Sequence, residues 1–474
     1  MNGPGEPAEQ SNTLTRRRYL AAATALSALA WTGCGVAATQ APAKGSQGTG
    51  AGQWAHSKET SDASGAFTIV TWEGPGKIEK WQQHIDSFFT SFYPKVKVEM
   101  ETVGGVGDAL TKLVTVVASG VSLDYIWMHD TRCATAASKG LATPLDDFLK
   151  RLPSPGWPDK FFKTQVDAFR YQGKQYALPY DWAPGGFYVN LDLLDAKGIK
   201  LPPETWTFAD LLDAARQLTK NTGEPATSTW GVDLPLSSSG SYWIVRNFGG
   251  ETVAGEPPKS QFSHPKTLEA YQYLYDLRWK HNVMATPDQL PGVGGSAKNA
   301  FANGKIGFWY ALNDQALQLV NLIKGAFRLG FVATPKGPDK RFQFVGGSGF
   351  TIPKTAARPE MAYELMRWIV ANPDNLPKTA TMAQGGTFVS RADFWEYGLP
   401  PKELNLDGDR FKRVFYDLGQ RDGVYPTYFV GFADWDPQVY GENMNPLWNG
   451  QQQDVKQALD RVQQETARRL QAGQ

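Results

Sequence analysis

The chain has 474 residues, of which 41% are hydrophobic and 12% aromatic, so it can bury a large core in two or three domain-sized units. This composition excludes a disordered or fibrous protein. The 48 Lys and Arg residues nearly balance the 47 Asp and Glu residues, which gives no general electrostatic reason to bind nucleic acid or an anionic membrane. The 16 Trp and 18 Tyr residues are numerous, and an aromatic-lined site is plausible, although most of these rings are expected in the core.

Residues 1–33 have the pattern of an export signal peptide. Thr15-Arg16-Arg17-Arg18-Tyr19-Leu20 resembles the twin-arginine motif, and a short apolar stretch follows over residues 21–31. That stretch is well below the roughly 20 residues that cross a bilayer, so a permanent membrane helix is the weaker interpretation. Thr32-Gly33-Cys34 resembles a bacterial lipobox, which predicts that Cys34 is acylated and becomes the first mature residue. Cleavage near Ala37-Ala38, with release of a soluble protein, is the alternative.

Residues 34–65 are rich in Gly, Ala, Ser, Thr and Gln and carry almost no periodic apolar residues, which indicates a flexible tether. The folded part is expected to begin near Phe67. Cys133 is the second of the two cysteines, so lipidation of Cys34 would leave no pair for an internal disulfide. Cys133 is expected to be a small buried apolar residue.

The first part of the folded chain alternates strand and helix patterns. Strands are predicted over residues 67–72, 96–100 and 124–129, and helices over 78–92 and 110–117 with Gly120 as the end signal. This β-α-β-α-β run favours an α/β fold with a parallel sheet that helices cover on both faces. Ligands of such sheets bind at the carboxyl ends of the strands, where Trp72, Glu73 and Asp130 are expected.

The stretch from Tyr171 to Leu218 carries the most information. It contains Tyr171-Gln172-Gly173-Lys174-Gln175-Tyr176-Ala177-Leu178-Pro179-Tyr180, then residues 187–194 and 206–212. Thr207 and Asp210 approximate a capping box at the start of a helix whose apolar residues share one face.

This stretch resembles the carbohydrate-type extracellular solute-binding proteins of ABC importers, the family that includes maltose-binding protein. Further similar stretches follow in the family's order and cover nearly everything from Phe67 to the end. They are residues 124–127, 140–146, 301–309, 346–352 and 362–369 and the C-terminal helix with Val455, Leu459 and Val462.

The resemblance implies a two-lobed periplasmic-binding-protein-like fold, with hinged lobes and a ligand cleft between them. Lobe 1 is expected over residues 66–181 with 349–375, and lobe 2 over 182–345 with 380–474. Crossing segments are expected near Tyr180 to Pro184, near Val345 to Gly349 and around Pro373 to Gln384, where Pro and Gly cluster.

No catalytic or metal-binding motif is found in the sequence. The five His residues show no zinc-site spacing, and Gly346-Gly347-Ser348-Gly349 lacks the Lys of a phosphate cradle, so it is interpreted as a hinge where backbone approaches closely. No metal or cofactor is therefore expected, and the family resemblance implies a binding protein without enzyme activity. Glu73, Asp130 and Asp181 could form the acid and base pair of a glycoside hydrolase, accept hydrogen bonds from sugar hydroxyls, or cap helices and pair with cations. A structural or adhesive surface protein without a small ligand is the third class.

The resemblance implies a sugar-stacking platform at Trp309 with Tyr310. The stretch Phe301 to Trp309 predicts a helix end that leads through Gly304 into a short strand ending at the Trp, and this strand end is expected to open on the cleft. An indole can cover the apolar face of a pyranose, while carboxylates accept from its hydroxyls; the competing interpretation of Trp309 is a core residue. The predicted ligand-binding residues are Trp72, Glu73, Asp130, Asp181, Trp182, Trp243, Trp309, Tyr310, Gly347 and Ser348.

The resemblance also implies the partners and the location. A monomeric receptor on the outer face of the cell membrane, or secreted if Cys34 is not lipidated, is expected to deliver a sugar or oligosaccharide to a membrane permease. The ATP-hydrolysing subunits are separate proteins, because this chain has no nucleotide site. Which sugar it binds is not specified by the sequence.

Overall fold

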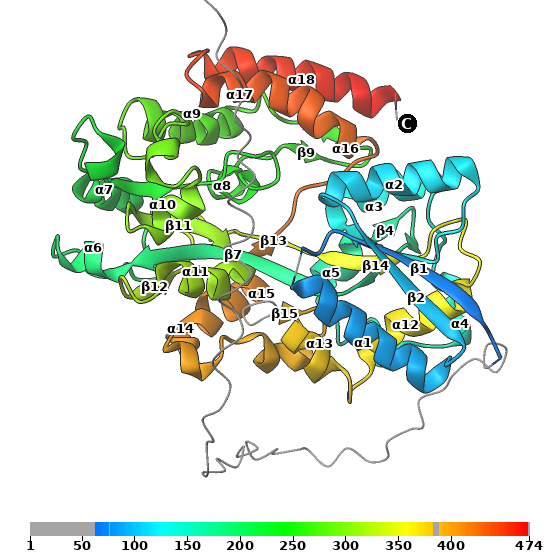
Figure 1. Ribbon diagram of the computed structural model, residues 1–474. Coiled ribbons are helices and arrows are strands. Elements are labelled where there is room, and N and C mark those ends of the chain that lie inside the picture. The colour runs from blue at the N-terminus through cyan, green and yellow to red at the C-terminus, as the bar shows by residue number, and fades with distance from the viewer. Residues whose placement is uncertain (1–61, 75, 383–387, 473–474) are drawn as a thin grey trace, which may run out of the picture. The chain divides into compact units, whose positions relative to one another are not determined.

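The computed structural model describes residues 62–74, 76–382 and 388–472 of the chain (Figure 1). The predicted signal peptide, Cys34 and nearly all of the predicted tether lie outside these residues. Strand β1 (Gly65–Thr71) begins inside the stretch expected to be tether. The reason is pairing: Gly65 lies opposite Val96, and its amide donates to the Lys95 carbonyl at 3.2 Å.

The first sheet has five strands in the order β2-β1-β3-β14-β6. Its strands are β2 (Val96–Thr102), β1, β3 (Tyr125–His129), β14 (Ser348–Thr351) and β6 (Leu178–Pro179). Helix α1 (Lys77–Phe92) joins β1 to β2, and α2 (Val106–Ser119) joins β2 to β3. Because β1 pairs in parallel with both β2 and β3, the predicted β-α-β-α-β run is confirmed, whereas β14 pairs antiparallel with both β3 and β6.

Both faces of the first sheet are buried, which explains the uninterrupted apolar run of β3. Tyr125 and Trp127 pack in one hydrophobic cluster, whereas Ile126 and Met128 pack in another, as the two-residue period of a strand requires. Cys133 belongs to the second of these clusters and is buried as a free thiol, as predicted.

The second sheet has seven strands and is built around β7 (Asp181–Asn190), at 10 residues the longest strand in the described part of the chain. Figure 1 shows β7 as one continuous arrow. The order is β16-β13-β7-β11-β8, and β12 and β15 also pair with β7. The partners are β8 (Trp230–Asp233), β11 (Ile306–Leu312), β12 (Leu329–Val332), β13 (Gln343–Gly346), β15 (Phe388–Val389) and β16 (Gly423–Val424).

Helix α7 (Phe208–Leu218) begins with the predicted capping box. The Asp210 amide donates to Thr207 Oγ1 at 3.3 Å, and the Thr207 amide donates to Asp210 Oδ2 at 2.7 Å. Two donors at the helix start are thereby satisfied.

The remaining elements are mostly short helices. They are α3 (Asp130–Ser138), α4 (Asp146–Arg151), α5 (Lys163–Ala168), α6 (Leu191–Asp195), α8 (Tyr242–Asn247), α9 (Pro265–Trp279), α10 (Ala297–Ala302), α11 (Ala316–Ile323), α12 (Pro359–Ala371), α13 (Leu376–Met382), α14 (Gly408–Phe411), α15 (Leu418–Asp422), α16 (Phe432–Trp435), α17 (Glu442–Trp448) and α18 (Val455–Ala472). Two small hairpins are β4 (Arg170–Tyr171) with β5 (Lys174–Gln175) and β9 (Val253–Ala254) with β10 (Lys259–Ser260). Among the described residues, no helix is long and apolar enough to span a membrane.

The chain passes between the two sheets at Tyr180, which separates β6 from β7, and at Gly347, which separates β13 from β14. Both residues fall within the first two expected crossing segments. The third expected segment is largely helical, because α13 forms there and packs Leu376 and Ala380 against Val389. The strand after it, β15, pairs with β7. The lobe limits inferred from the resemblance stay predictions.

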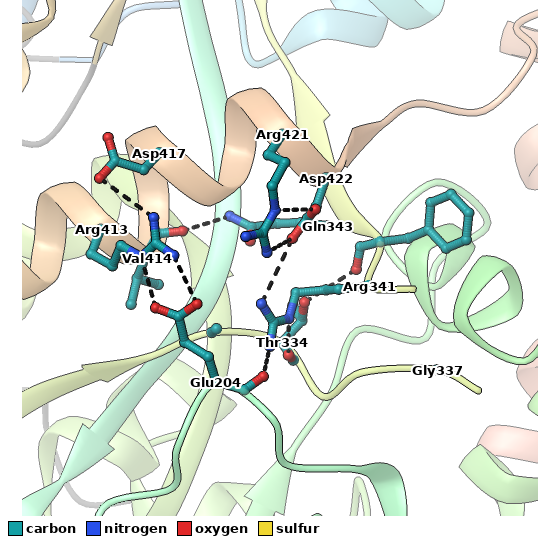
Figure 2. Close-up of polar contacts among 12 residues, drawn as sticks. Glu204, Thr334, Gly337, Arg341, Gln343, Arg413, Val414, Asp417, Arg421 and Asp422 are labelled. Carbon is teal, nitrogen blue, oxygen red and sulfur yellow. Dashed lines mark hydrogen bonds and ion pairs between the residues drawn. The ribbon is translucent and has the colours of Figure 1, made fainter. Parts of the chain in front are cut away.

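A buried guanidinium anchors the segment that leads into β13 (Figure 2). Arg341 is 5% exposed, donates from Nε to the Thr334 carbonyl at 2.7 Å and also donates to the Glu204 carbonyl. Its Nη1 lies 3.7 Å from Asp422 Oδ2, and the side chain of Gln343 donates to the Val414 carbonyl at 3.0 Å. The start of β13 is thereby bonded to the loop before α7 and to the C-terminal helices.

Gly347→Ala tests how tightly the β13–β14 connection is held. A Cβ at this position would lie 2.5 Å from both the Asp181 carbonyl oxygen and Gln165 Oε1, and the carbonyl belongs to backbone that cannot rotate away. We expect the free energy of unfolding to fall by about 1–3 kcal/mol, as for other overpacked sites, measured by urea denaturation. Gly107→Ala is the control, because a Cβ there meets nothing within 4 Å and alanine favours the helix. Equal stability of the two variants would contradict this account.

Candidate functional site

A cavity of about 290 Å³ lies where the two connections meet the ends of β1, β3 and β11. The lining residues are Trp72, Glu73, Lys77, Trp127, His129, Tyr180, Asp181, Ala183, Leu312, Asp314, Phe344, Gly346, Gly347 and Ser348. Carboxyl ends of strands are the usual ligand site of such sheets. A larger hollow of about 630 Å³ is lined by residues of α9 and of the start of α18, away from these strand ends. We therefore take the strand-end cavity as the candidate site.

Asp130 binds the connection at Gly347. Its Oδ2 accepts from the Gly347 amide at 3.0 Å, and its own amide donates to the Gly347 carbonyl at 3.2 Å. The Asp130 side chain is 1% exposed and is absent from the cavity lining, so in this structure it holds the wall and does not form it.

Asp181 lies on the cavity wall and contacts the other connecting segments. One carboxylate oxygen, Oδ1, accepts from the Ser348 amide, and the Asp181 carbonyl accepts from the Ser390 hydroxyl at 2.8 Å. The neighbouring Tyr180 amide donates to the Ser348 carbonyl at 2.8 Å. Two carboxylates, from Asp130 and Asp181, thus bind the adjacent amides of Gly347 and Ser348.

Two basic side chains on the wall are already paired with acids. Lys77 Nζ lies 3.6 Å from Glu73 Oε2, and His129 Nδ1 lies 2.9 Å from Asp130 Oδ1. Burial lowers the pKa of His129, but the charge and hydrogen bond of Asp130 and the charge of Asp181 outweigh burial, so the net shift is upward. The imidazole therefore holds its proton more readily than a free histidine.

Burial raises the pKa of Asp181 to about 7. The negative charges of Asp314 and Glu73 act in the same direction, whereas the amide of Ser348 and the charge of His129 oppose the shift. Asp181 can therefore carry a proton near neutral pH and can both donate and accept hydrogen bonds.

Aromatic rings form part of the wall. Trp72, Trp127, Tyr180 and Phe344 all line the cavity, and the Trp72 ring lies 6.4 Å from that of His129. Trp72 is only partly buried, so its side chain can contact a solute, whereas Trp127 is 1% exposed. Aromatic faces beside carboxylate acceptors suit a polar solute that also has apolar C–H surface.

The structure brings half of the predicted ligand residues to the cavity: Trp72, Glu73, Asp181, Gly347 and Ser348. The other half lie elsewhere. Trp182 stacks on Phe162 at 3.9 Å, and Trp243 stacks on Tyr310 at 4.7 Å, with both Trp side chains at most 1% exposed. A ligand role stays a prediction for four of these residues: Asp130, Trp182, Trp243 and Tyr310.

The expectation that the strand ends at Trp309 is wrong, because β11 continues to Leu312, which pairs with Gly185. Trp309 is 8% exposed and stacks on Phe301 at 5.7 Å. Trp309 and Tyr310 also belong to different hydrophobic clusters, since neighbours in a strand point to opposite faces. A stacking platform made by both therefore has no support in this arrangement, and Trp309 as a ligand contact stays a prediction.

Several cavity residues were not predicted from the sequence. At the end of β11 the cavity is lined by Leu312 and Asp314, and not by Trp309. The apolar run that continues to Leu312 could have shown that the strand extends past Trp309. Three further cavity residues lie next to predicted segments but belong to no motif that could have identified them: Lys77, His129 and Phe344. The described residues contain no group of three or more His, Cys, Asp or Glu side chains that could hold a metal.

The raised pKa of Asp181 predicts a pH dependence of stability. Because the folded-state pKa of about 7 exceeds the unfolded value near 3.9, the stability that protonated Asp181 gives is lost as the pH rises from about 4 to about 7. Asp181→Asn keeps an acceptor for the Ser348 amide and removes the titration. The free energy of unfolding of the variant relative to wild type should therefore rise between pH 4 and pH 8, by at most about 4 kcal/mol, and melting temperatures measured at each pH would follow this change. Parallel pH profiles of the two proteins would contradict the assignment.

Comparison with known proteins places the chain among binding proteins. A family model described as bacterial extracellular solute-binding protein matches residues 74–375. A binding protein from Brucella abortus (strain 2308) is 24% identical over 288 residues, which are 59% of this chain. The match covers 65% of the length of that curated relative.

Solved structures share the fold. The ABC substrate-binding protein Lmo0181 from Listeria monocytogenes, in complex with cycloalternan, has a TM-score of 0.71 and 21% identity, with 86% of this chain and 100% of that chain covered. The GacH receptor of Streptomyces glaucescens, solved unliganded and with acarbose, has a TM-score of 0.70 and 19% identity, with 87% and 100% covered. The expected α/β fold of the periplasmic-binding-protein type is confirmed by these similarities. With the family model matching more than half of its length, the chain belongs to the bacterial extracellular solute-binding protein family.

Proposed function

We propose that this protein is the extracytoplasmic receptor of an ABC importer, which captures a sugar or oligosaccharide and delivers it to a membrane permease. The observation that carries the proposal is the cavity at the strand ends, where hydrogen-bond acceptors and aromatic faces from both sheets converge. Solved relatives of the same fold were crystallised with cycloalternan, acarbose or mannobiose. Family membership supports binding without chemistry.

The connections support a hinge mechanism. Tyr180 and Gly347 join the sheets through very short links, and the amides of Gly347 and Ser348 are bound by carboxylates. A solute that contacts both sheets would bind the closed arrangement better and would shift an open–closed equilibrium toward it. Closure would then report occupancy to the permease.

A glycoside hydrolase is the rival function, since three carboxylates line the cavity. Burial and neighbouring charges account for the raised pKa of Asp181, so this shift needs no catalytic role. A thermal-shift screen of mono- and oligosaccharides, followed by product analysis, separates the two functions, because a ligand that binds only the folded state raises the melting temperature. A ligand-induced shift without products supports the receptor, and steady turnover contradicts it.

Trp72→Ala and Trp309→Phe together identify the aromatic contact. We propose that Trp72, on the cavity wall, stacks on the sugar, whereas Trp309 stabilises the core. Trp72→Ala should lower the affinity for the sugar found in the screen by roughly 30-fold, equal to about 2 kcal/mol, with little change in melting temperature. Trp309→Phe should lower the melting temperature and keep the affinity. The reverse pattern, measured by calorimetric titration, would restore Trp309 as the platform.

We further propose twin-arginine export and lipidation at Cys34, which place the receptor on the outer face of the cell membrane. One acyl chain anchors only marginally, so two or three chains are implied. Cys34→Ser should abolish labelling with a fatty acid and release the protein or block its processing. Cys133→Ser is the matched control, because this buried thiol should leave labelling unchanged. An unlabelled wild-type protein would contradict lipidation and favour a soluble product.

A further inference from the structure

The cavity carries an excess of acidic groups that its own cations do not neutralise. Glu73 has Lys77 at 3.6 Å, and the His129 imidazole is paired with Asp130. Asp181 and Asp314 also line the cavity, but no Lys, Arg or His nitrogen of the described residues lies within 4.0 Å of their carboxylates. Their hydrogen bonds come from neutral donors: the Ser348 amide binds Asp181, and Gln315 Nε2 binds Asp314 Oδ1 at 3.0 Å.

These two carboxylates come from separate parts of the chain. Asp181 is the first residue of β7, and Asp314 lies in the 3-10 helix η3 (Asn313–Gln315) that follows β11. The repulsion between their charges is felt at Asp181, where it adds to burial in raising the pKa. The charge of His129 offsets part of this repulsion at Asp181, and a cation bound between the two carboxylates would relieve the rest.

The rest of the wall also indicates a polar ligand. Trp127 lines the cavity and is 1% exposed, yet its indole Nε1 has no hydrogen-bond acceptor in the described part of the chain. A buried N–H normally has a partner, so this one is consistent with an oxygen acceptor on a solute. The aromatic rings of Trp72, Tyr180 and Phe344 on the same wall favour a neighbouring cation through their negative faces.

A metal ion fits this arrangement poorly. A metal site needs several ligating side chains converging on one point, and the described residues contain no such group of three or more acids, His or Cys. An organic cation needs only one or two carboxylates as acceptors and carries its own N–H donors.

We infer that the solute bears an ammonium group that binds between Asp181 and Asp314, so that the receptor selects an amino sugar or an oligosaccharide containing one. This inference rests on the proposed function and names the solute class of the same cavity. Charge-assisted hydrogen bonds from the ammonium to both carboxylates give the selectivity, and the sugar hydroxyls and C–H faces occupy the remaining acceptors and rings. Asp314 is the specificity-determining residue, since it contributes negative charge without bonding the connecting strands.

Matched pairs of neutral and aminated saccharides test the inference. Calorimetric titrations at pH 7 would compare glucosamine with glucose, galactosamine with galactose, and the β-1,4-linked glucosamine disaccharide with cellobiose. At least one amine should bind about tenfold more tightly than its neutral partner, the gain expected for a charge-assisted contact. Titration in two buffers of different ionisation enthalpy should show that binding of the aminated sugar releases protons to the buffer, whereas binding of the neutral sugar does not. The reason is that the bound ammonium displaces the proton of Asp181.

Asp314→Asn provides the variant, and Asp409→Asn, at an exposed carboxylate of α14 outside the cavity, is the matched control. Asp314→Asn should reduce the amine-to-neutral affinity ratio to near one, and Asp409→Asn should leave it at the wild-type value. Neutral sugars that bind as tightly as their amines, or a ratio that Asp314→Asn does not change, would overturn the inference and leave the proposed function standing. No binding by any amine at millimolar concentration also overturns it, and the neutral sugars then test the proposed function separately.

Discussion

The binding of two adjacent backbone amides by two carboxylates is the contact on which the site depends. Asp130 accepts from Gly347 and Asp181 accepts from Ser348, so the single residue between β13 and β14 is fixed from two directions. Buried backbone donors must be paired, and here side chains pair the amides of Gly347 and Ser348. This pairing sets the position of the cavity wall relative to the ends of β1 and β3. The close approach of the chain here also explains why this residue is glycine, because a Cβ at Gly347 would lie 2.5 Å from the Asp181 carbonyl oxygen.

The same contact would couple ligand binding to the proposed hinge. In this structure Asp130 bonds the connection and does not line the cavity, whereas Asp181 bonds the connection and also lines the cavity. A solute that changes the charge or the hydrogen bonds of Asp181 therefore acts directly on the strand that joins the sheets. Because the start of β13 is anchored through Arg341, relative motion of the sheets would be concentrated near Gly347 (Figure 2).

The tryptophan residues fall into two groups, because some are buried in the core whereas Trp72 lines the cavity. Rings such as Trp243 and Trp309 lie on strands or helices covered by other side chains and give their area to the core. Trp72 follows the end of β1, where the sheet stops and the cavity begins, so its ring remains partly accessible. Because all three residues are Trp, the difference in their exposure comes from where each lies along its strand or helix. The acidic wall around the accessible ring offers hydrogen-bond acceptors to hydroxyl and ammonium groups alike.

The sequence by itself determined the α/β architecture, because alternating strand and helix periods, the Thr207 capping box and the Gly120 end signal are local features. It also pointed to Trp72 and Glu73 at predicted strand ends, and the family resemblance placed Asp181, Gly347 and Ser348 in the expected crossing segments. Only the tertiary structure decided that Trp309 packs inside and that Asp314 lines the cavity, because the end of β11 is set by its pairing with β7 up to Leu312. Nor could the sequence show that Asp181 lines the cavity whereas Asp130 does not. The cavity wall is formed by residues more than 100 positions apart. Which carboxylate faces the cavity therefore depends on packing between distant segments, because no local preference determines it.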